Sequence, residues 1–145
     1  MERLDIPTER GSVLTGVLFP AENADTVVIA ITGIHGNFYS NPFYYNIGET
    51  LNSGGYDFIY AQTNDAFSEI ETYNVKTGAA ETIGSWNERF SYTDDDISAY
   101  LNYAAKRKLS KASCATARAG TCCRFISWAG LSARRIPPTT GCMAS

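Results

Sequence analysis

The 145-residue sequence lacks several residues and motifs on which common protein chemistries depend. It has one histidine, His35, so a catalytic triad would have to use that imidazole. It has no Cys-X-X-Cys pair, and two of its four cysteines, Cys122 and Cys123, are adjacent, which is not the spacing of a zinc site. It also has no Gly-X-Ser-X-Gly, the motif that places a nucleophilic serine on a tight turn. We therefore predict no metal site and no cofactor.

Long apolar runs are absent as well, and the first eight residues are polar and charged. No segment approaches the length of a membrane span, and no secretory signal is visible. The sequence therefore predicts a cytoplasmic protein without a membrane partner.

Acidic residues are absent after Asp96, whereas eight of the twelve lysines and arginines lie at or after Lys106. All four cysteines also lie in this basic tail. We divide the chain into an acidic body, residues 1–106, and a tail, residues 107–145, whose structure the sequence does not predict. Such a tail is typical of an arm that binds nucleic acid or a membrane surface. It would also result from the joining of two unrelated sequences.

The body has the pattern of an α/β protein. Alternating apolar residues predict a strand over Ser12–Phe19, and an apolar run predicts another over Thr26–Ile31. Asn41 and Pro42 are suited to open a helix whose apolar face is formed by Phe43, Ile47 and Leu51, and Gly54-Gly55 would end it. A third strand follows over Tyr56–Ala61. This strand, helix and strand predict a parallel crossover.

The segment 64–92 is compatible with either a hairpin around Lys76-Thr77-Gly78 or an extended excursion over the sheet. Thr93 and the acidic run Asp94 to Asp96 then predict a helix start, because a hydroxyl caps free N–H groups and carboxylates favour the positive end of the helix dipole. We expect this helix to end near residues 106–108. Helix capping alone accounts for the acidic run, and a solvated helix end accounts for Lys106, Arg107, Lys108 and Lys111.

The strongest functional signal is the turn that follows the apolar strand ending at Ile31. A Gly-X-His-Gly turn at a strand end directs unpaired N–H groups at the space beyond it, as an oxyanion site of an acyl-transfer enzyme requires. We predict an oxyanion or substrate loop from His35, Gly36, Asn37 and Phe38, with Gly36 and Asn37 contributing main-chain N–H groups. The early position of His35 favours a role in this loop over that of a general base.

Three separated segments, HGNFYSNPFYYNIGETLNSGGYDFIYAQT, ETYNVKTG and GSWNERF, resemble the N-terminal half of a bacterial α/β-hydrolase family of serine hydrolases. The resemblance covers about residues 10–106. It implies a partial α/β-hydrolase-like sheet, mostly parallel with helices on both faces, interrupted before the nucleophile elbow. In the family the elbow, the acid and the catalytic histidine come later, and the reaction is cleavage of an ester or related acyl bond.

The resemblance stops after residue 106. Read in a shifted frame, the codons for Ala115 to Thr121 are compatible with His-Ser-Lys-Gly-Gly-Asn, an elbow-like motif at about the expected place. A frameshift is therefore our hypothesis for the origin of the tail. Gly130-Leu131-Ser132 imitates half of an elbow, but Arg134 stands where the second glycine belongs. We assign no catalytic residue to this chain.

These observations predict a relative of serine esterases and acyl hydrolases that is inactive because nucleophile, acid and base are missing. Whether it is an enzyme would be decided by ester turnover. The alternative is a non-enzymatic binding protein whose basic tail recruits nucleic acid or an acidic partner, and of these partners nucleic acid is the less favoured. Without later strands, the sheet is expected either to self-associate or to be covered by the tail.

Overall fold

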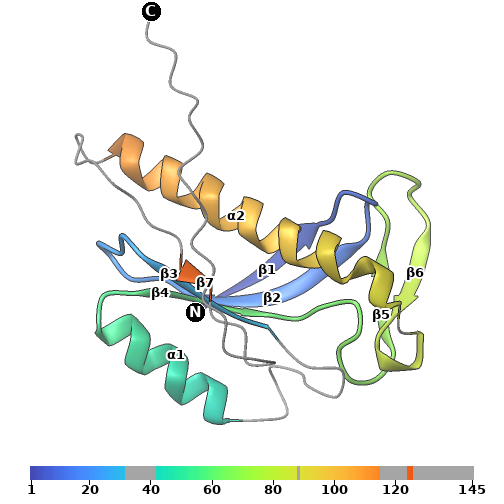
Figure 1. The fold of residues 1–145 in the computed structure, drawn as a ribbon, viewed down its shortest axis with the longest axis horizontal. Coiled ribbons are helices and arrows are strands. Elements are labelled where there is room, and N and C mark those ends of the chain that lie inside the picture. Colours follow the sequence, from blue (N-terminus) through green and yellow to red (C-terminus); the bar gives the residue numbers. More distant parts are fainter. Residues whose placement is uncertain (32–41, 88, 115–123, 126–145) are drawn as a thin grey trace, which may run out of the picture.

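The computed structural model describes residues 1–31, 42–87, 89–114 and 124–125. Seven strands are present in these segments: β1 (Glu2–Pro7), β2 (Val13–Phe19), β3 (Val27–Ile31), β4 (Asp57–Ala61), β5 (Ile70–Tyr73), β6 (Ala80–Ile83) and β7 (Arg124–Phe125). The helices are α1 (Phe43–Ser53) and α2 (Thr93–Cys114), with short 3-10 turns at Ser85–Asn87 and Phe90–Tyr92. The main sheet lies between the two helices, with α1 on one face and α2 on the other (Figure 1).

The prediction of a mostly parallel, α/β-hydrolase-like sheet is wrong. The five-stranded sheet has the order β1-β2-β4-β3-β7, and its β1–β2 and β2–β4 pairings are antiparallel. Only β3–β4 and β3–β7 are parallel. The second sheet, β5–β6, is also antiparallel. The fold is a mixed α/β arrangement rich in antiparallel pairs.

The lengths of the connections explain this mixture. A parallel pair requires a crossover of about a dozen residues or more, whereas residues 8–12 and 20–26 are the only links between β1 and β2 and between β2 and β3. Each link reverses the chain direction. The longer connection from β3 to β4, which contains α1, allows parallel pairing, with Ile31 opposite Ala61. The predicted strand–helix–strand crossover is therefore confirmed.

Helix α1 ends as the sequence predicts. The N–H of Gly55 donates to the carbonyl of Asn52, and that of Tyr56 donates to the carbonyl of Leu51, both at 3.0 Å. These two bonds form a Schellman motif, which requires a left-handed residue, and Gly55 has φ of 82°. At the other end Pro42 is the N-cap without a side-chain hydrogen bond, and Asn41 lies outside the described residues.

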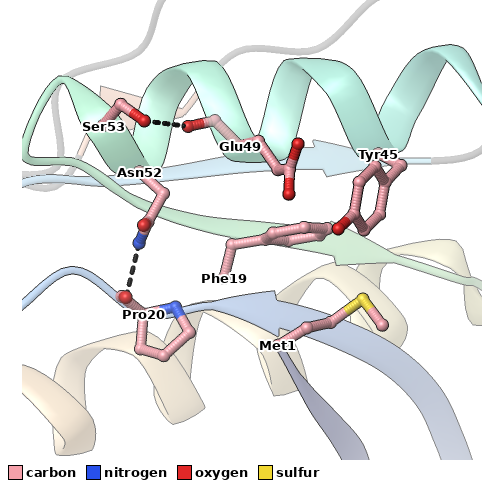
Figure 2. A pocket seen from close by; sticks show the side chains of 7 residues that line it. All are labelled: Met1, Phe19, Pro20, Tyr45, Glu49, Asn52 and Ser53. Atoms are coloured by element: carbon pink, nitrogen blue, oxygen red, sulfur yellow. Dashed lines mark hydrogen bonds between the residues drawn. The ribbon is translucent and has the colours of Figure 1, made fainter.

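Gly48 allows α1 to approach β2 closely. A Cβ built on Gly48 would lie 2.7 Å from the Phe19 ring, so only glycine fits at this point of the helix. Phe19 therefore lies directly beneath α1, beside Tyr45 and Glu49 of the helix (Figure 2).

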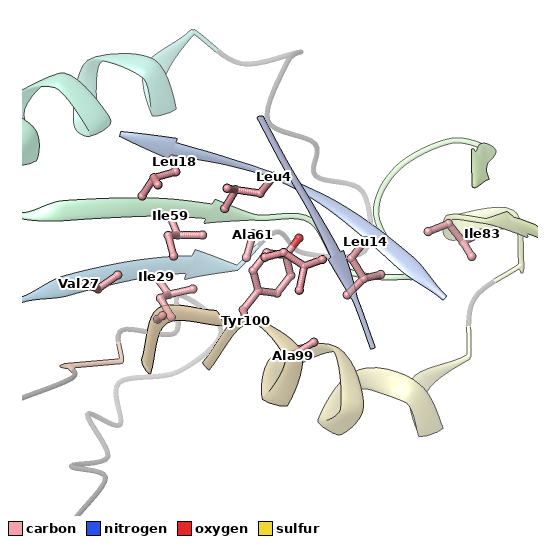
Figure 3. Packing of buried hydrophobic residues seen from close by; sticks show 12 residues of the cluster. Leu4, Leu14, Leu18, Val27, Ile29, Ile59, Ala61, Ile83, Ala99 and Tyr100 are labelled. Carbon is pink, nitrogen blue, oxygen red and sulfur yellow. The ribbon is translucent and has the colours of Figure 1, made fainter. Parts of the chain in front are cut away.

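The strands separate two apolar clusters by simple alternation, because successive side chains of a strand point to opposite faces. In β4, Ile59 and Ala61 join the cluster under α2, whereas Phe58 and Tyr60 join the one under α1. Tyr100 and Ala99 of α2 pack on the first cluster with Leu14 of β2 (Figure 3). Burial on both faces makes β4 the central strand of the fold.

Helix α2 and the tail differ from expectation. The helix continues to Cys114 and does not end near residues 106–108. Two residues of the basic tail, Arg124 and Phe125, form β7 against Val28 and Ile29 of β3. Within the described segments, no helix is long and apolar enough to cross a membrane.

Candidate functional site

The predicted loop residues His35, Gly36, Asn37 and Phe38 lie outside the described residues. The structure does describe the strand end from which this loop departs. Ile31 ends β3 and is paired with Ala61, the last residue of β4. The carboxyl ends of these two parallel strands therefore lie side by side, which is the usual place of ligand sites in α/β proteins.

A buried polar segment, Gln62 to Asp65, follows β4 directly at this edge. The N–H of Asn64 donates to Oδ2 of Asp96 at 2.7 Å. Oδ1 of Asp65 accepts the side-chain amide of Asn64 at 3.0 Å and the N–H of Arg89 at 2.9 Å. Helix α2 and the turn before it thus fix the segment after β4.

Arg10, in the turn between β1 and β2, completes this cluster. Its guanidinium pairs with Oδ2 of Asp95 at 2.8 Å and with Oδ1 of Asp96 at 2.6 Å. The Cζ atom also lies 4.4 Å from the centroid of the Tyr92 ring, a cation–π distance. The carboxylate of Asp95 additionally accepts the N–H groups of Glu9 and Arg10. One cation therefore binds the first turn of α2 to the β1–β2 turn.

The two neighbouring carboxylates have pKa values shifted in opposite directions. Burial is the largest influence on both and raises the pKa of Asp96, in spite of the N–H of Asn64 and the guanidinium of Arg10. For Asp95 burial also acts upward, but the hydrogen bonds from Glu9 and Arg10 outweigh it and lower the pKa. The acidic run is thus more than the helix cap that the sequence suggested, because two of its members hold Arg10.

Tyr100 of α2 also contacts the buried segment Gln62 to Asp65. Its hydroxyl accepts the N–H of Gln62 at 3.1 Å and lies 2.8 Å from the carbonyl oxygen of Thr15. Burial raises the pKa of this hydroxyl far above the ordinary tyrosine value, so it stays protonated and can donate. A Cβ on Gly16 would come within 3.2 Å of the hydroxyl, so this glycine leaves room for it.

The cluster is a network of hydrogen bonds and ion pairs that joins the segment after β4 to α2 and to the β1–β2 turn. No group of three or more His, Cys, Asp or Glu among the described residues could hold a metal ion. What the cluster does is hold the chain after β4 in place, beside the end of β3.

Other sequence interpretations have mixed outcomes. Arg107 is not merely solvated, because its Nε lies 3.4 Å from Oδ2 of the buried Asp57 and its guanidinium reaches Glu2. Tyr44 and Tyr60 stack with ring centroids 4.2 Å apart in the cluster under α1. Ser132 lies outside the described residues.

Sequence reasoning missed Arg10 and the segment Gln62 to Asp65. Arg10 has no local signal, since its partners lie about 85 residues away in the chain. The sequence did contain a signal for the segment Gln62 to Asp65, because these four polar residues directly follow the apolar run of a central strand.

Comparison of the chain with protein-family models, with curated proteins and with solved structures found no match.

Proposed function

We propose that this chain is a non-catalytic relative of serine acyl hydrolases. In this proposal residues His35 to Phe38 form the loop that contacts the carbonyl oxygen of an ester or acyl group in catalytically complete relatives. The mixed sheet does not identify a family, so the proposal depends on the placement of the loop.

The observation that carries the proposal is the crossover β3–α1–β4. Its parallel register pairs Ile31 with Ala61, so the carboxyl ends of both strands lie side by side. Main-chain N–H groups that follow a strand in this position are free to meet a developing negative charge. The hydrogen bonds of Gln62, Asn64 and Asp65 support the proposal because they immobilise the neighbouring chain.

Inactivity follows from the sequence. Acyl transfer by a triad requires a nucleophile and a base in contact, and the 145 residues offer one histidine and no Gly-X-Ser-X-Gly. The purified chain is expected to hydrolyse p-nitrophenyl acetate and butyrate at the rate of buffer, and Ser132→Ala is expected to change nothing. Turnover that is lost in Ser132→Ala would contradict both the inactivity and our interpretation of the half-elbow as coincidence.

The alternative, recruitment of nucleic acid by the basic tail, has less support. Arg107, one of the basic residues at the start of that tail, is engaged by Asp57 and Glu2. An electrophoretic shift of DNA or RNA that weakens steeply with salt would nevertheless favour this alternative over the proposed function.

A further inference from the structure

Strand β1 forms one edge of the main sheet. It is the outermost strand of the order β1-β2-β4-β3-β7, and within the described segments it pairs only with β2. An edge strand presents main-chain N–H and C=O groups with which a further strand can pair. The register between β1 and β2 shows which of these groups face outward.

The main-chain groups of Arg3 and Asp5 point away from β2. Directly after β1, the N–H of Thr8 donates to the carbonyl of Ser12 at 2.9 Å, so the main chain at Thr8 faces the neighbouring strand. The same register continues through β1 without a bulge, and in an antiparallel pair the direction of these groups alternates from one residue to the next. Arg3 and Asp5 therefore direct their N–H and C=O groups outward.

Pro7 limits the edge to this short stretch. It occupies the next outward position along β1, and proline has no N–H to donate to a partner strand. Within β1, a complete donor and acceptor pair therefore faces outward at Arg3 and at Asp5.

The side chains at the same two positions carry opposite charges and lie in solvent. The side chains of Arg3 and Asp5 are 72% and 52% exposed, and Nε of Arg3 lies 3.1 Å from Oδ1 of Asp5. They are on the face opposite to that of Leu4, which is buried in the cluster under α2 (Figure 3). A cation and an anion two positions apart make this edge complementary to an antiparallel copy of itself.

We propose that β1 pairs with β1 of a second copy of this chain, in antiparallel orientation and with the two Leu4 residues opposite each other. Arg3 then lies opposite Asp5 of the second copy, and Asp5 lies opposite its Arg3. Each of these pairs exchanges main-chain hydrogen bonds in both directions and sets opposite charges at cross-strand distance. The contact is the same on both copies, as a two-fold symmetric dimer requires. Edge charges exclude a strand of unrelated sequence, whereas this pairing satisfies them.

The test is the mass of the full chain over a range of concentrations, measured by sedimentation equilibrium. Wild type is expected to approach the mass of a dimer as the concentration rises. Asp5→Arg places arginines opposite each other at both pairs and should raise the dissociation constant about tenfold or more, because two attractions become repulsions. Glu69→Arg makes the same change of charge at an exposed position outside β1, and this control should dimerise as wild type does.

A mixture of two variants makes the result specific to this register. Arg3→Asp places aspartates opposite each other and should also dimerise poorly by itself. Mixed with Asp5→Arg, however, it meets an opposite charge at both pairs, so the mixture is expected to form a dimer about as tightly as wild type. A mixture that stays monomeric, although circular dichroism shows that both variants are folded, would overturn the proposal.

The location of the contact is measured by ¹H–¹⁵N NMR of wild type at increasing concentration. The amides of Arg3 and Asp5 are expected to shift and to exchange more slowly with solvent, because they become hydrogen-bonded across the dimer. Shifts confined to β3 would identify the opposite side of the sheet as the contact and overturn the proposal. A wild-type chain that is monomeric up to its solubility limit, or an Asp5→Arg variant that dimerises as wild type does, would also overturn it.

Discussion

Adjacent carboxylates of one helix turn can have pKa values shifted in opposite directions. Asp95 and Asp96 share the guanidinium of Arg10, yet the pKa of the first is lowered and that of the second is raised. Burial is the largest cause of the raised pKa of Asp96. Asp95 accepts two N–H groups of the β1–β2 turn, which together with Arg10 lower its pKa more than burial raises it. Asp96, which is fully buried, accepts one from Asn64.

Asp95→Asn is expected to lower the free energy of unfolding at pH 7 by about 1–2 kcal/mol, because charge-assisted hydrogen bonds are weakened. A folded-state pKa below the unfolded value means that the ionised carboxylate stabilises the fold above the ordinary pKa of 3.8. This stabilisation is lost as the pH falls through the folded-state value. Urea unfolding of wild type and Asp95→Asn at about pH 7, 5 and 3 measures this. The difference in free energy of unfolding should be full at about pH 7 and 5 and smaller at about pH 3.

Asp94→Asn is the control, since Asp94 is exposed in the same helix turn. It should change stability by only a few tenths of a kcal/mol, roughly the effect of one charge on the helix dipole. A difference between wild type and Asp95→Asn that is independent of pH would refute the role assigned to the Asp95 carboxylate.

At the level of secondary structure elements, local patterns predicted most of the described body. The strands that became β2, β3 and β4 and the helix α1 with its glycine end were predicted. The hairpin around Gly78 was one of two possibilities that the sequence left open, and the antiparallel pairing of β5 with β6 decides for it. Strand β1 was missed, although Leu4 and Ile6 alternate with charged residues in the pattern of a half-buried strand. Strand direction was wrong because it depends on connection lengths, which the pattern of a single strand does not contain.

The end of α2 was also mispredicted, for a related reason. Basic residues at 106–108 are typical of a helix terminus, but Arg107 pairs with Asp57 of β4 and the helix continues. The proposed loop at His35 to Phe38 stays a prediction, since those residues lie outside the described segments.

Helix α1 gives a prediction in which packing and helix propensity oppose each other. Alanine normally favours a helix over glycine by about 1 kcal/mol. At Gly48, however, the new methyl group would lie 2.7 Å from the Phe19 ring, so Gly48→Ala should instead destabilise the protein by about 1–3 kcal/mol. Thermal or urea unfolding measures this. Thr50→Ala, at an exposed position of the same helix, is the control and should be neutral or slightly stabilising. If Gly48→Ala stabilised the protein, α1 would not contact Phe19 as described.

At the scale of the whole molecule, the edges of the main sheet differ in their protection. The β1 edge carries charged residues and Pro7, which discourage pairing with a strand of unrelated sequence. At the other side the two-residue strand β7 is outermost, and its Arg124 and Phe125 pair with Val28 and Ile29, so they cover only part of the apolar strand β3. The tail therefore takes part in the fold, whatever its origin.

Removal of residues 115–145 is expected to uncover this edge of β3. The shortened chain should then self-associate, and light scattering should report an average mass that rises with concentration more steeply than for the full chain. An unchanged mass, together with an unchanged cooperative unfolding transition, would show that β7 does not protect the sheet.

The central claim, a relative of serine acyl hydrolases that has lost its catalytic residues, is tested most directly by labelling with a fluorophosphonate. The gene is altered by a single-base insertion or deletion between the codons for about residues 105 and 115. The protein from the altered gene and the 145-residue chain are each treated with the probe, and their masses are measured by mass spectrometry. The account predicts a longer product that gains one adduct on the serine of the restored motif, whereas the 145-residue chain gains none. A stop codon soon after the motif, a folded product that is not labelled, or an adduct on the 145-residue chain would contradict the account.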